Sequence, residues 1–158
     1  MSQVQIGQPV PDFELPSSEG GTIRLSQFRG RKVVLYFYPK DMTPTCTQES
    51  CDFRDANALF GEANAVVLGI SPDDAKSHAK FIAKHQLTFP LLADVDRKVA
   101  EMFGVWQEKK MYGRTYMGIV RSTFLIDERG ILAQEWRNVR VKGHIDAVLA
   151  AVRAQQPG

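Results

Sequence analysis

Two cysteines, Cys46 and Cys51, are the residues of this 158-residue chain best suited to covalent chemistry. Cys46 follows an apolar run at residues 33–38 and a turn that contains Pro39 and Pro44. This order predicts a strand, a turn and then a helix with Cys46 in its first turn. The N–H groups there have no internal partner and the helix dipole is positive, so the position favours a reactive thiolate.

The first turn of this helix can begin at either of two residues. With Thr43 as N-cap and Pro44 at the first position, Cys46 is the third helical residue. With Thr45 as N-cap, Cys46 is the first helical residue and Gln48 completes a capping box. Free cysteines are often small buried apolar residues. The polar and proline neighbours of Cys46 argue against burial in a core.

The spacing of the two cysteines limits how they can react with each other. Five helical residues separate Cα atoms by about 8.7 Å and place the side chains about 140° apart. A disulfide needs Cα atoms within about 7 Å. Cys46 and Cys51 therefore cannot bridge across an intact helix, and a bridge between them requires the first turns to unwind. A redox cycle fits this placement better than a permanent disulfide.

The elements around the cysteines predict an α/β fold with a mixed central sheet, because strands and helices alternate and one hairpin comes late. Buried or central strands are expected at residues 32–38, 65–71 and 121–126, with a short strand at 89–94 and the return strand of a hairpin at 131–136. Helices are expected from residue 43 or 45 to about 60, and at 72–85, 97–103 and 143–154. The second helix would have Ser71 as N-cap and Pro72 at its first position. An extended segment at 7–15 and a short strand at 22–25 form an N-terminal extension.

Length and composition predict one domain over residues 1–158, since 44% hydrophobic residues supply a core. A net charge of +2 with dispersed Lys and Arg gives no indication of nucleic acid or membrane binding. Residues 1–15 lack a signal-peptide pattern, and no apolar run reaches the length of a membrane span. The expected location is the cytoplasm, where a cysteine pair is more often catalytic, redox-active or metal-binding than a structural staple.

Several motifs together resemble peroxiredoxins of the bacterioferritin comigratory protein, or peroxiredoxin Q, type. Pro39, Thr43 and Cys46 meet the Pro-x3-Thr-x2-Cys pattern of peroxiredoxins, and a distant Arg-Ser-Thr-Phe begins at Arg121. Thr45 departs from the family, which often has Gly there. The similarity extends over nearly the whole chain, through residues 11–13, 36–41, 43–44, 46–47, 49, 51, 53–55, 69–71, 112–113 and 121–127. It implies a thioredoxin-like fold whose central sheet is flanked by helices.

The resemblance also implies an activity, the reduction of hydroperoxides. Cys46 would be the peroxidatic nucleophile that becomes a sulfenic acid. Cys51 would be the resolving cysteine that closes an internal disulfide. Thioredoxin or a similar dithiol would reopen that disulfide. No cofactor or metal is implied, and the protein is expected to be a monomer.

Four other residues receive roles from the same resemblance. Thr43 would hydrogen-bond the peroxide, although a helix cap alone would also explain a threonine there. Arg121 would place a permanent cation beside the thiolate and the breaking O–O bond, the alternative being an ordinary surface ion pair. Pro39 would shield the pocket from water. Glu49 would orient the arginine.

The remaining chemistry-bearing residues are interpreted as unreactive. The three histidines, His78, His85 and His144, lie in separate polar helical contexts, so we expect them to be solvated. Two cysteines are too few for a closed zinc site. An apolar-rich stretch precedes Arg121 and is either loop packing or, as we favour, a lining for organic hydroperoxides. It contains Met111, Tyr112, Tyr116 and Met117.

Three rival functions remain beside a peroxidase. A protein thiol–disulfide oxidoreductase usually carries Cys-x2-Cys, and the four-residue gap here disfavours it. A non-enzymatic peroxide sensor would use the same chemistry without turnover. A copper-delivery module would require His or Met close to the cysteine pair.

Overall fold

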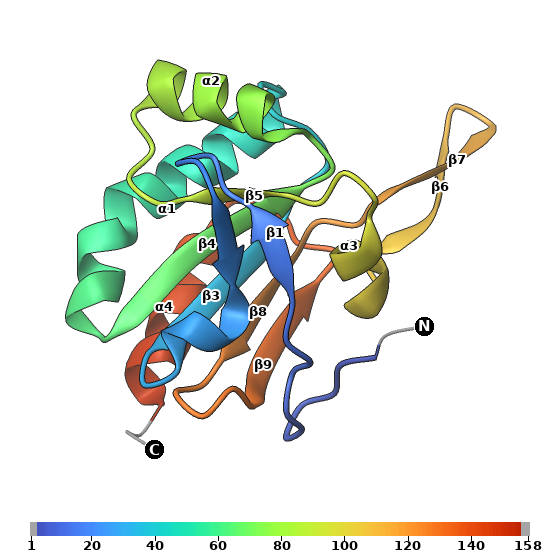
Figure 1. Ribbon diagram of the computed structural model, residues 1–158. Helices are drawn as coiled ribbons and strands as arrows, with labels where there is room; N and C mark the ends of the chain where they lie inside the picture. The colour runs from blue at the N-terminus through green and yellow to red at the C-terminus, as the bar shows by residue number, and fades with distance from the viewer. Residues whose placement is uncertain (1–2, 156–158) are drawn as a thin grey trace.

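A mixed five-stranded sheet in the order β5-β4-β3-β8-β9 forms the centre of the computed structural model, which describes residues 3–155 (Figure 1). Strands β3, β4 and β5 run parallel, and β8 and β9 are antiparallel to their neighbours. Their bounds are β3 Lys32–Phe37, β4 Ala65–Ser71, β5 Leu91–Ala93, β8 Ser122–Ile126 and β9 Leu132–Arg137. The predicted α/β class with a mixed sheet is confirmed.

Different elements cover the two faces of the sheet, and Figure 1 shows the N-terminal hairpin crossing one face with α1 and α4 behind the other. The helices are α1 Pro44–Glu62, α2 Ala75–His85, α3 Lys98–Met102 and α4 His144–Ala154. The hairpin consists of β1 Glu14–Pro16 and β2 Thr22–Arg24, followed by the 3-10 turn η1 Leu25–Phe28. It is the predicted N-terminal extension.

Strand β3 is buried along its whole length because its side chains enter two cores. Val33, Leu35 and Phe37 pack with residues of the N-terminal segment and α3. Val34 and Tyr36 pack with residues of α1, α2 and α4. Side chains alternate across a strand, so a strand covered on both faces is apolar on both of them, as β3 is after Lys32. This explains why the apolar run before Cys46 predicted a central strand.

Helix α2 begins later than predicted. Its N-cap is Asp74, whose carboxylate accepts a hydrogen bond from Ser77 N at 2.8 Å. The predicted cap, Ser71, instead donates from Oγ to Asp73 Oδ2 at 2.7 Å. The prediction was wrong because Ser71 and Asp74 are both residue types that cap helices. Asp74 lies directly before the first helical residue and accepts from Ser77 N, whereas Ser71 forms a local hydrogen bond with Asp73.

A second hairpin, β6 Trp106–Met111 with β7 Arg114–Ile119, was not predicted and extends as an arm from the sheet (Figure 1). Its strands are largely exposed and lack an apolar–polar alternation. Tyr112 and Gly113 form its two-residue turn, with positive φ angles of 53° and 77°. Two successive positive φ angles are typical of tight hairpin turns. The Tyr-Gly pair was therefore the available sequence signal.

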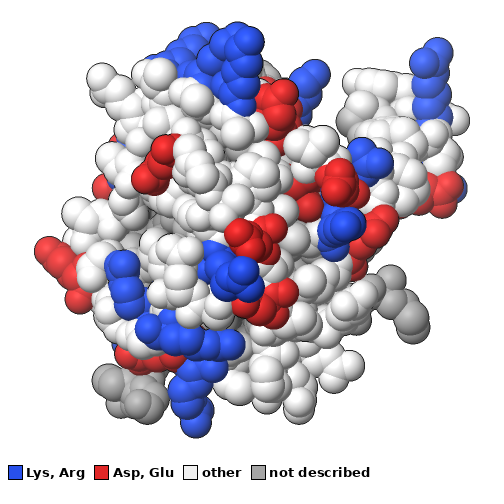
Figure 2. Space-filling view, viewed as in Figure 1, with Lys and Arg blue, Asp and Glu red and all other residues white. Residues whose placement is uncertain are grey.

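Surface charge is mixed on the face shown in Figure 2, where Asp and Glu lie among Lys and Arg and the basic side chains gather mainly over α2 and at the lower edge. Such interspersed charge agrees with the net charge of +2. Within residues 3–155, no helix is both long and apolar enough to cross a membrane.

Candidate active site

Cys46 is the third residue of α1, after Thr43 as N-cap and Pro44 at the first position. The structure thus confirms the first of the two predicted helix starts. Thr43 does not cap the helix with its side chain. Its Oγ1 donates to Lys40 O at 2.8 Å instead. The hydroxyl proton is therefore engaged, and the lone pairs of the Thr43 oxygen remain to accept a hydrogen bond.

The sulfur of Cys46 lies inside the molecule, with the residue only 1% exposed. It belongs to the core cluster that contains Tyr36 and Phe53. The expectation that its polar neighbours would keep it out of a core was wrong. Pro44 and Thr45 occupy the exposed side of the first turn, and the third helical position turns inward toward the sheet.

Arg121 brings a permanent positive charge to this buried sulfur. It lies just before β8, and its Nη2 donates to Cys46 Sγ at 3.3 Å. Its Nη1 donates to Glu49 Oε1 at 2.5 Å. Cys46 and Glu49 are three residues apart on one face of α1, so a single planar guanidinium reaches both. The side chain of Arg121 is 12% exposed, which is unlike an ordinary surface ion pair.

Glu49 occupies an unfavourable position for a carboxylate. It is fully buried, and among the described residues its Oε2 has no hydrogen-bond partner. Burial raises the pKa of Glu49 to about 7, against the opposing effect of the Arg121 charge and hydrogen bond. Arg121 is therefore the main group that compensates a negative charge on Glu49.

An open hollow of about 400 Å³ gives access to this region from solvent. It is lined by Pro39, Gln107, Lys109, Val120, Arg121, Asn138 and Val139. Two of the predicted site residues, Pro39 and Arg121, thus face one concave surface. The guanidinium that contacts Cys46 Sγ therefore lines this hollow.

The apolar stretch before Arg121 does not line this hollow, so that expectation was wrong. Its four large side chains lie on the β6–β7 arm and are 41–97% exposed: Met111, Tyr112, Tyr116 and Met117. The base of the arm supplies Gln107 and Lys109 to the hollow instead.

Comparison with known proteins shows the family to which this chain belongs. Residues 6–135 match the AhpC/TSA family. The chain belongs to this family. It is 53% identical to the peroxiredoxin Bcp of Bacillus subtilis over 150 residues, which cover 95% of this chain and 96% of the relative. As a Bcp/PrxQ-type peroxiredoxin, the protein is a peroxidase.

Solved structures of this type show the same architecture. A structure of Xanthomonas campestris peroxiredoxin Q has a TM-score of 0.90 at 43% identity, over 98% of this chain and 99% of that chain. A second structure concerns alkyl peroxide reduction by the bacterioferritin comigratory protein of the same species. It has a TM-score of 0.86 at 46% identity and covers 90% of each chain. The predicted thioredoxin-like fold is confirmed.

Cys51 of this peroxiredoxin lies in the same continuous helix as Cys46. It is half-buried, and both cysteines are free thiols in the structure. The predicted helix across both residues is therefore present, with their Cα atoms separated by about 8.7 Å at helical spacing. Closing a disulfide between them requires a change in α1.

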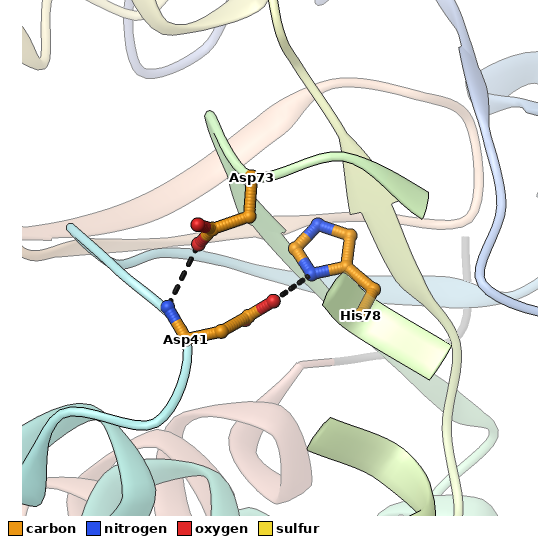
Figure 3. A group of neighbouring side chains, drawn as sticks. All are labelled: Asp41, Asp73 and His78. Atoms are coloured by element: carbon orange, nitrogen blue, oxygen red, sulfur yellow. Dashed lines mark hydrogen bonds and ion pairs between the residues drawn. The ribbon is translucent and has the colours of Figure 1, made fainter. Parts of the chain in front are cut away.

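The interpretation of the histidines as solvated was wrong for His78. It is fully buried, and its Nδ1 lies at 2.8 Å from Asp41 Oδ2 (Figure 3). Its Nε2 donates to Leu92 O at 2.9 Å. The sequence signal was its position three residues before Phe81, on the apolar face of α2. His85 is half-buried with its ring against the edge of Phe81, so it is solvated only in part.

His144 is also buried, contrary to expectation. It begins α4, is 6% exposed, and its Nε2 lies at 2.8 Å from Thr123 Oγ1. Burial, and secondarily the charge of Arg121, lower the pKa of His144 to about 4. The histidine is therefore neutral in the folded protein at neutral pH.

This shift predicts a pH-dependent loss of stability that His144→Gln should reduce. The folded pKa lies below the ordinary value of 6.5, so the contribution of neutral His144 is complete above pH 6.5 and is lost as the pH falls toward 4. At pH 5 the loss is about 2 kcal/mol. Glutamine retains a hydrogen-bonding group near Thr123 but does not titrate.

The measurement is urea unfolding of both proteins between pH 7.5 and 4.5, compared as a difference. The difference is needed because the raised pKa of Glu49 acts in the opposite direction, stabilising the fold below pH 4.5 and losing that effect as the pH rises through 7. Parallel curves for the wild type and His144→Gln would contradict the prediction.

Proposed function

We propose that this peroxiredoxin reduces hydrogen peroxide and organic hydroperoxides, with Cys46 as the attacking residue. The observation that carries the proposal is the contact of 3.3 Å between Arg121 Nη2 and Cys46 Sγ, with the guanidinium held by Glu49. Organic substrates are included because the Xanthomonas campestris relative is described by its alkyl peroxide reduction activity.

In the first step the Cys46 thiolate attacks the terminal oxygen of the hydroperoxide. An S–O bond forms, the O–O bond breaks, and its electron pair leaves with the alkoxide, which takes a proton to become the alcohol. Thr43 accepts a hydrogen bond from the peroxide through its oxygen, and Arg121 stabilises the charge that moves from sulfur to oxygen. Pro39 restricts water at the hollow. The product on the enzyme is Cys46 sulfenic acid.

In the second step the Cys51 thiolate attacks the sulfenic sulfur and water leaves. The S–S bond forms as the S–O bond breaks, and the leaving hydroxide takes a proton to become that water. The result is an intramolecular Cys46–Cys51 disulfide, which forms only when the first turns of α1 unwind. Because the bridge lies within one chain, the cycle needs no second copy, and we infer a monomer. Thioredoxin or a similar dithiol then reduces the disulfide. A cytoplasmic location is part of the proposal because this step needs such a dithiol.

The test is continuous NADPH oxidation with peroxide, thioredoxin and thioredoxin reductase. Steady turnover that needs both peroxide and thioredoxin supports the proposed cycle. Consumption of one equivalent of peroxide without turnover would support the sensor instead. Turnover on protein disulfides without peroxide would support a thiol–disulfide oxidoreductase, which the 1% exposure of Cys46 disfavours.

A further prediction of this cycle is that oxidation opens the start of α1. Amides from Thr45 to about Phe53 should exchange with solvent faster in the disulfide form than in the dithiol form, because their helical hydrogen bonds are broken. Hydrogen exchange with mass spectrometry measures this, and a non-reducing gel should show the oxidised protein as a monomer.

Cys51→Ser is the matched control for this prediction. It should keep the amides protected after one equivalent of peroxide, stop at the sulfenic acid, and over-oxidise at high peroxide because nothing captures that intermediate. Equal protection in both redox states of the wild type, with the disulfide confirmed by mass, would rule out the unwinding.

A further inference from the structure

The loop between β3 and α1 is anchored from inside the protein by Asp41. This loop carries Pro39 and Thr43, and Asp41 lies two residues from each. Unlike its neighbours Lys40 and Met42, which are exposed, Asp41 is only 5% exposed. A buried carboxylate between two exposed residues must have strong partners to be stable.

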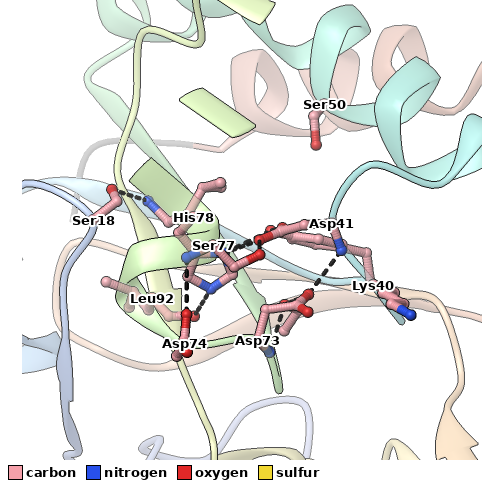
Figure 4. A network of polar contacts seen from close by, with 12 residues as sticks. Ser18, Lys40, Asp41, Ser50, Asp73, Asp74, Ser77, His78 and Leu92 are labelled. Atoms are coloured by element: carbon pink, nitrogen blue, oxygen red, sulfur yellow. Dashed lines mark hydrogen bonds and ion pairs between the residues drawn. The ribbon is translucent and has the colours of Figure 1, made fainter. Parts of the chain in front are cut away.

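Asp41 has such partners on both oxygens, and Figure 4 shows Asp41 beside Ser77 and His78 of α2. Oδ1 accepts from the Tyr38 hydroxyl at 2.6 Å. Oδ2 accepts from Ser77 Oγ at 2.8 Å and faces His78 Nδ1 at 2.8 Å. Tyr38 belongs to the same loop, whereas Ser77 and His78 belong to α2. The carboxylate therefore fixes the loop to a neighbouring helix.

His78 makes this attachment rigid because its second nitrogen is also engaged. Leu92 O can only accept, so Nε2 carries a proton and donates it. The ring thus connects the loop at Asp41, helix α2 and strand β5.

The backbone of the loop shows that it is held in a conformation it would not adopt freely. Met42 has a φ angle of 67°, in the left-handed region, which is unfavourable for a residue other than glycine. On one side, Asp41 N donates to Asp73 Oδ2 at 2.7 Å. On the other, Thr43 Oγ1 donates to Lys40 O. Strain of this kind persists only where surrounding contacts determine the conformation.

The cluster of Asp41, Asp73 and His78 does not fit a cation site. One ligand atom from each of Asp41, Asp73 and His78 lies within 4.8 Å of the others, a spacing that would permit metal binding. Both oxygens of Asp41 and both nitrogens of His78 already have hydrogen-bond partners. The cluster is therefore satisfied as a hydrogen-bond network.

We propose that Asp41 and His78 are positioning residues for peroxide reduction, which anchor the loop so that Thr43 and Pro39 keep their places beside Cys46. The proposal rests on the proposed roles of those two loop residues. The anchor also determines which part of the chain stays in place when α1 unwinds. The loop before Cys46 remains fixed, the helix opens after Thr43, and α1 later refolds against an unchanged pocket wall.

Two substitutions of His78 separate the anchor from simple core packing. His78→Asn places an amide nitrogen near the position of Nδ1 and keeps a donor toward Asp41. His78→Gln places one near Nε2 and keeps the donor toward Leu92 O but not the bond to Asp41. Both replace a buried ring by a smaller neutral amide, so they are matched in their general cost to the fold.

The rate constant for oxidation of Cys46 by peroxide, measured by stopped-flow fluorescence in a single turnover, is the main readout. His78→Gln should lower it about 10-fold to 100-fold, since misplacing a reacting group by 1 Å costs up to about 100-fold. His78→Asn should stay within about threefold of the wild type on the same argument. If His78→Gln does not fold, Ser77→Ala removes one Asp41 contact and should slow the reaction by more than the threefold allowed for His78→Asn; a rate within threefold of the wild type would overturn the anchor.

Alkylation of Cys46 by iodoacetamide distinguishes positioning of the loop from a merely structural role, because a structural defect would change the alkylation rate and the peroxide rate together. It needs the thiolate but neither Thr43 nor Pro39, so His78→Gln should leave its rate unchanged. Asp94→Asn is the control for a general loss of stability. Asp94 is another buried carboxylate, which accepts from Val99 N and Ala100 N away from the loop. That variant should be less stable to urea and unchanged toward peroxide.

Three results with the His78 variants would overturn the anchor: a wild-type peroxide rate in His78→Gln, equal slowing in His78→Asn and His78→Gln, or alkylation that slows in step with peroxide reduction. Thr43→Val, measured in parallel, distinguishes the anchor from its premise. Slow peroxide reduction in Thr43→Val with a normal rate in His78→Gln rejects the anchor alone. A normal rate in Thr43→Val removes the proposed role of Thr43 and, with it, this proposal.

Discussion

Replacing Cys46 by serine should abolish peroxide reduction while the fold remains intact. A serine hydroxyl is not ionised at neutral pH and is a far weaker nucleophile than a thiolate. The other cysteine, Cys51, is not among the groups that Arg121 contacts in the structure. Serine is close to cysteine in size, so circular dichroism and the urea midpoint should change little. Thioredoxin-coupled NADPH oxidation should fall to the rate without enzyme.

Cys51→Ser is the control variant for this experiment. With dithiothreitol in place of thioredoxin, it should still consume the first equivalent of peroxide at the wild-type rate, because Cys46 and its partners are unchanged. The two serine variants then separate attack on peroxide from resolution. Peroxide-dependent turnover that survived in Cys46→Ser would remove Cys46 from the proposed role.

Local sequence signals predicted the part of the site that is close in sequence. An apolar run before two prolines and a threonine was enough to place Cys46 in the first turn of α1. The spacing to Cys51 was enough to show that the two cannot bridge across a helix. Both inferences use only backbone geometry, which is why they could be made without knowledge of what packs against the helix.

The contacts that complete the site join residues far apart in the chain and could not be derived from spacing. Arg121 and Cys46 are 75 residues apart, and only the resemblance to peroxiredoxins placed them together. The burial of Cys46, and of His78 and His144, depends on which helix face meets the sheet. In each case the polar neighbours lie on the opposite, exposed face, so local polarity predicted exposure where the structure has a core.

Asp41 is a third case, because it lies in the motif at residues 36–41 but received no physical role from the sequence. Its function in the loop follows from Ser77 and His78, which α2 brings to it. The sequence gives no direct sign of this, because the start of α2 was itself placed too early. Correct placement of Asp74 as the cap puts Ser77 and His78 in the first turn, on the side of the helix that meets Asp41.

The second large effect is expected for Arg121→Ala. Loss of a preorganised charge at a transition state costs about 10²–10³ in rate, so peroxide oxidation of Cys46 should slow by that factor. Iodoacetamide alkylation at neutral pH should also slow, because the thiolate loses the donor at 3.3 Å. Thr43→Val should slow the peroxide step more than alkylation, since its oxygen has no contact with the sulfur in the proposed mechanism. Stopped-flow oxidation and alkylation rates measure the two effects separately.

The same substitution has a cost for the fold that must be distinguished from its chemical effect. Arg121→Ala leaves Glu49 fully buried without its cation, and breaking a buried pair costs about 3–5 kcal/mol. The double variant Glu49→Gln with Arg121→Ala removes the unpaired buried carboxyl group and should recover much of that stability without recovering the peroxide rate. Arg121→Lys keeps one charge but cannot contact Cys46 and Glu49 through a planar fork, so its rate should lie between the wild type and Arg121→Ala. If stability and rate return together in the double variant, Arg121 acts on the fold alone; if only stability returns, the guanidinium acts on the reacting sulfur and oxygen.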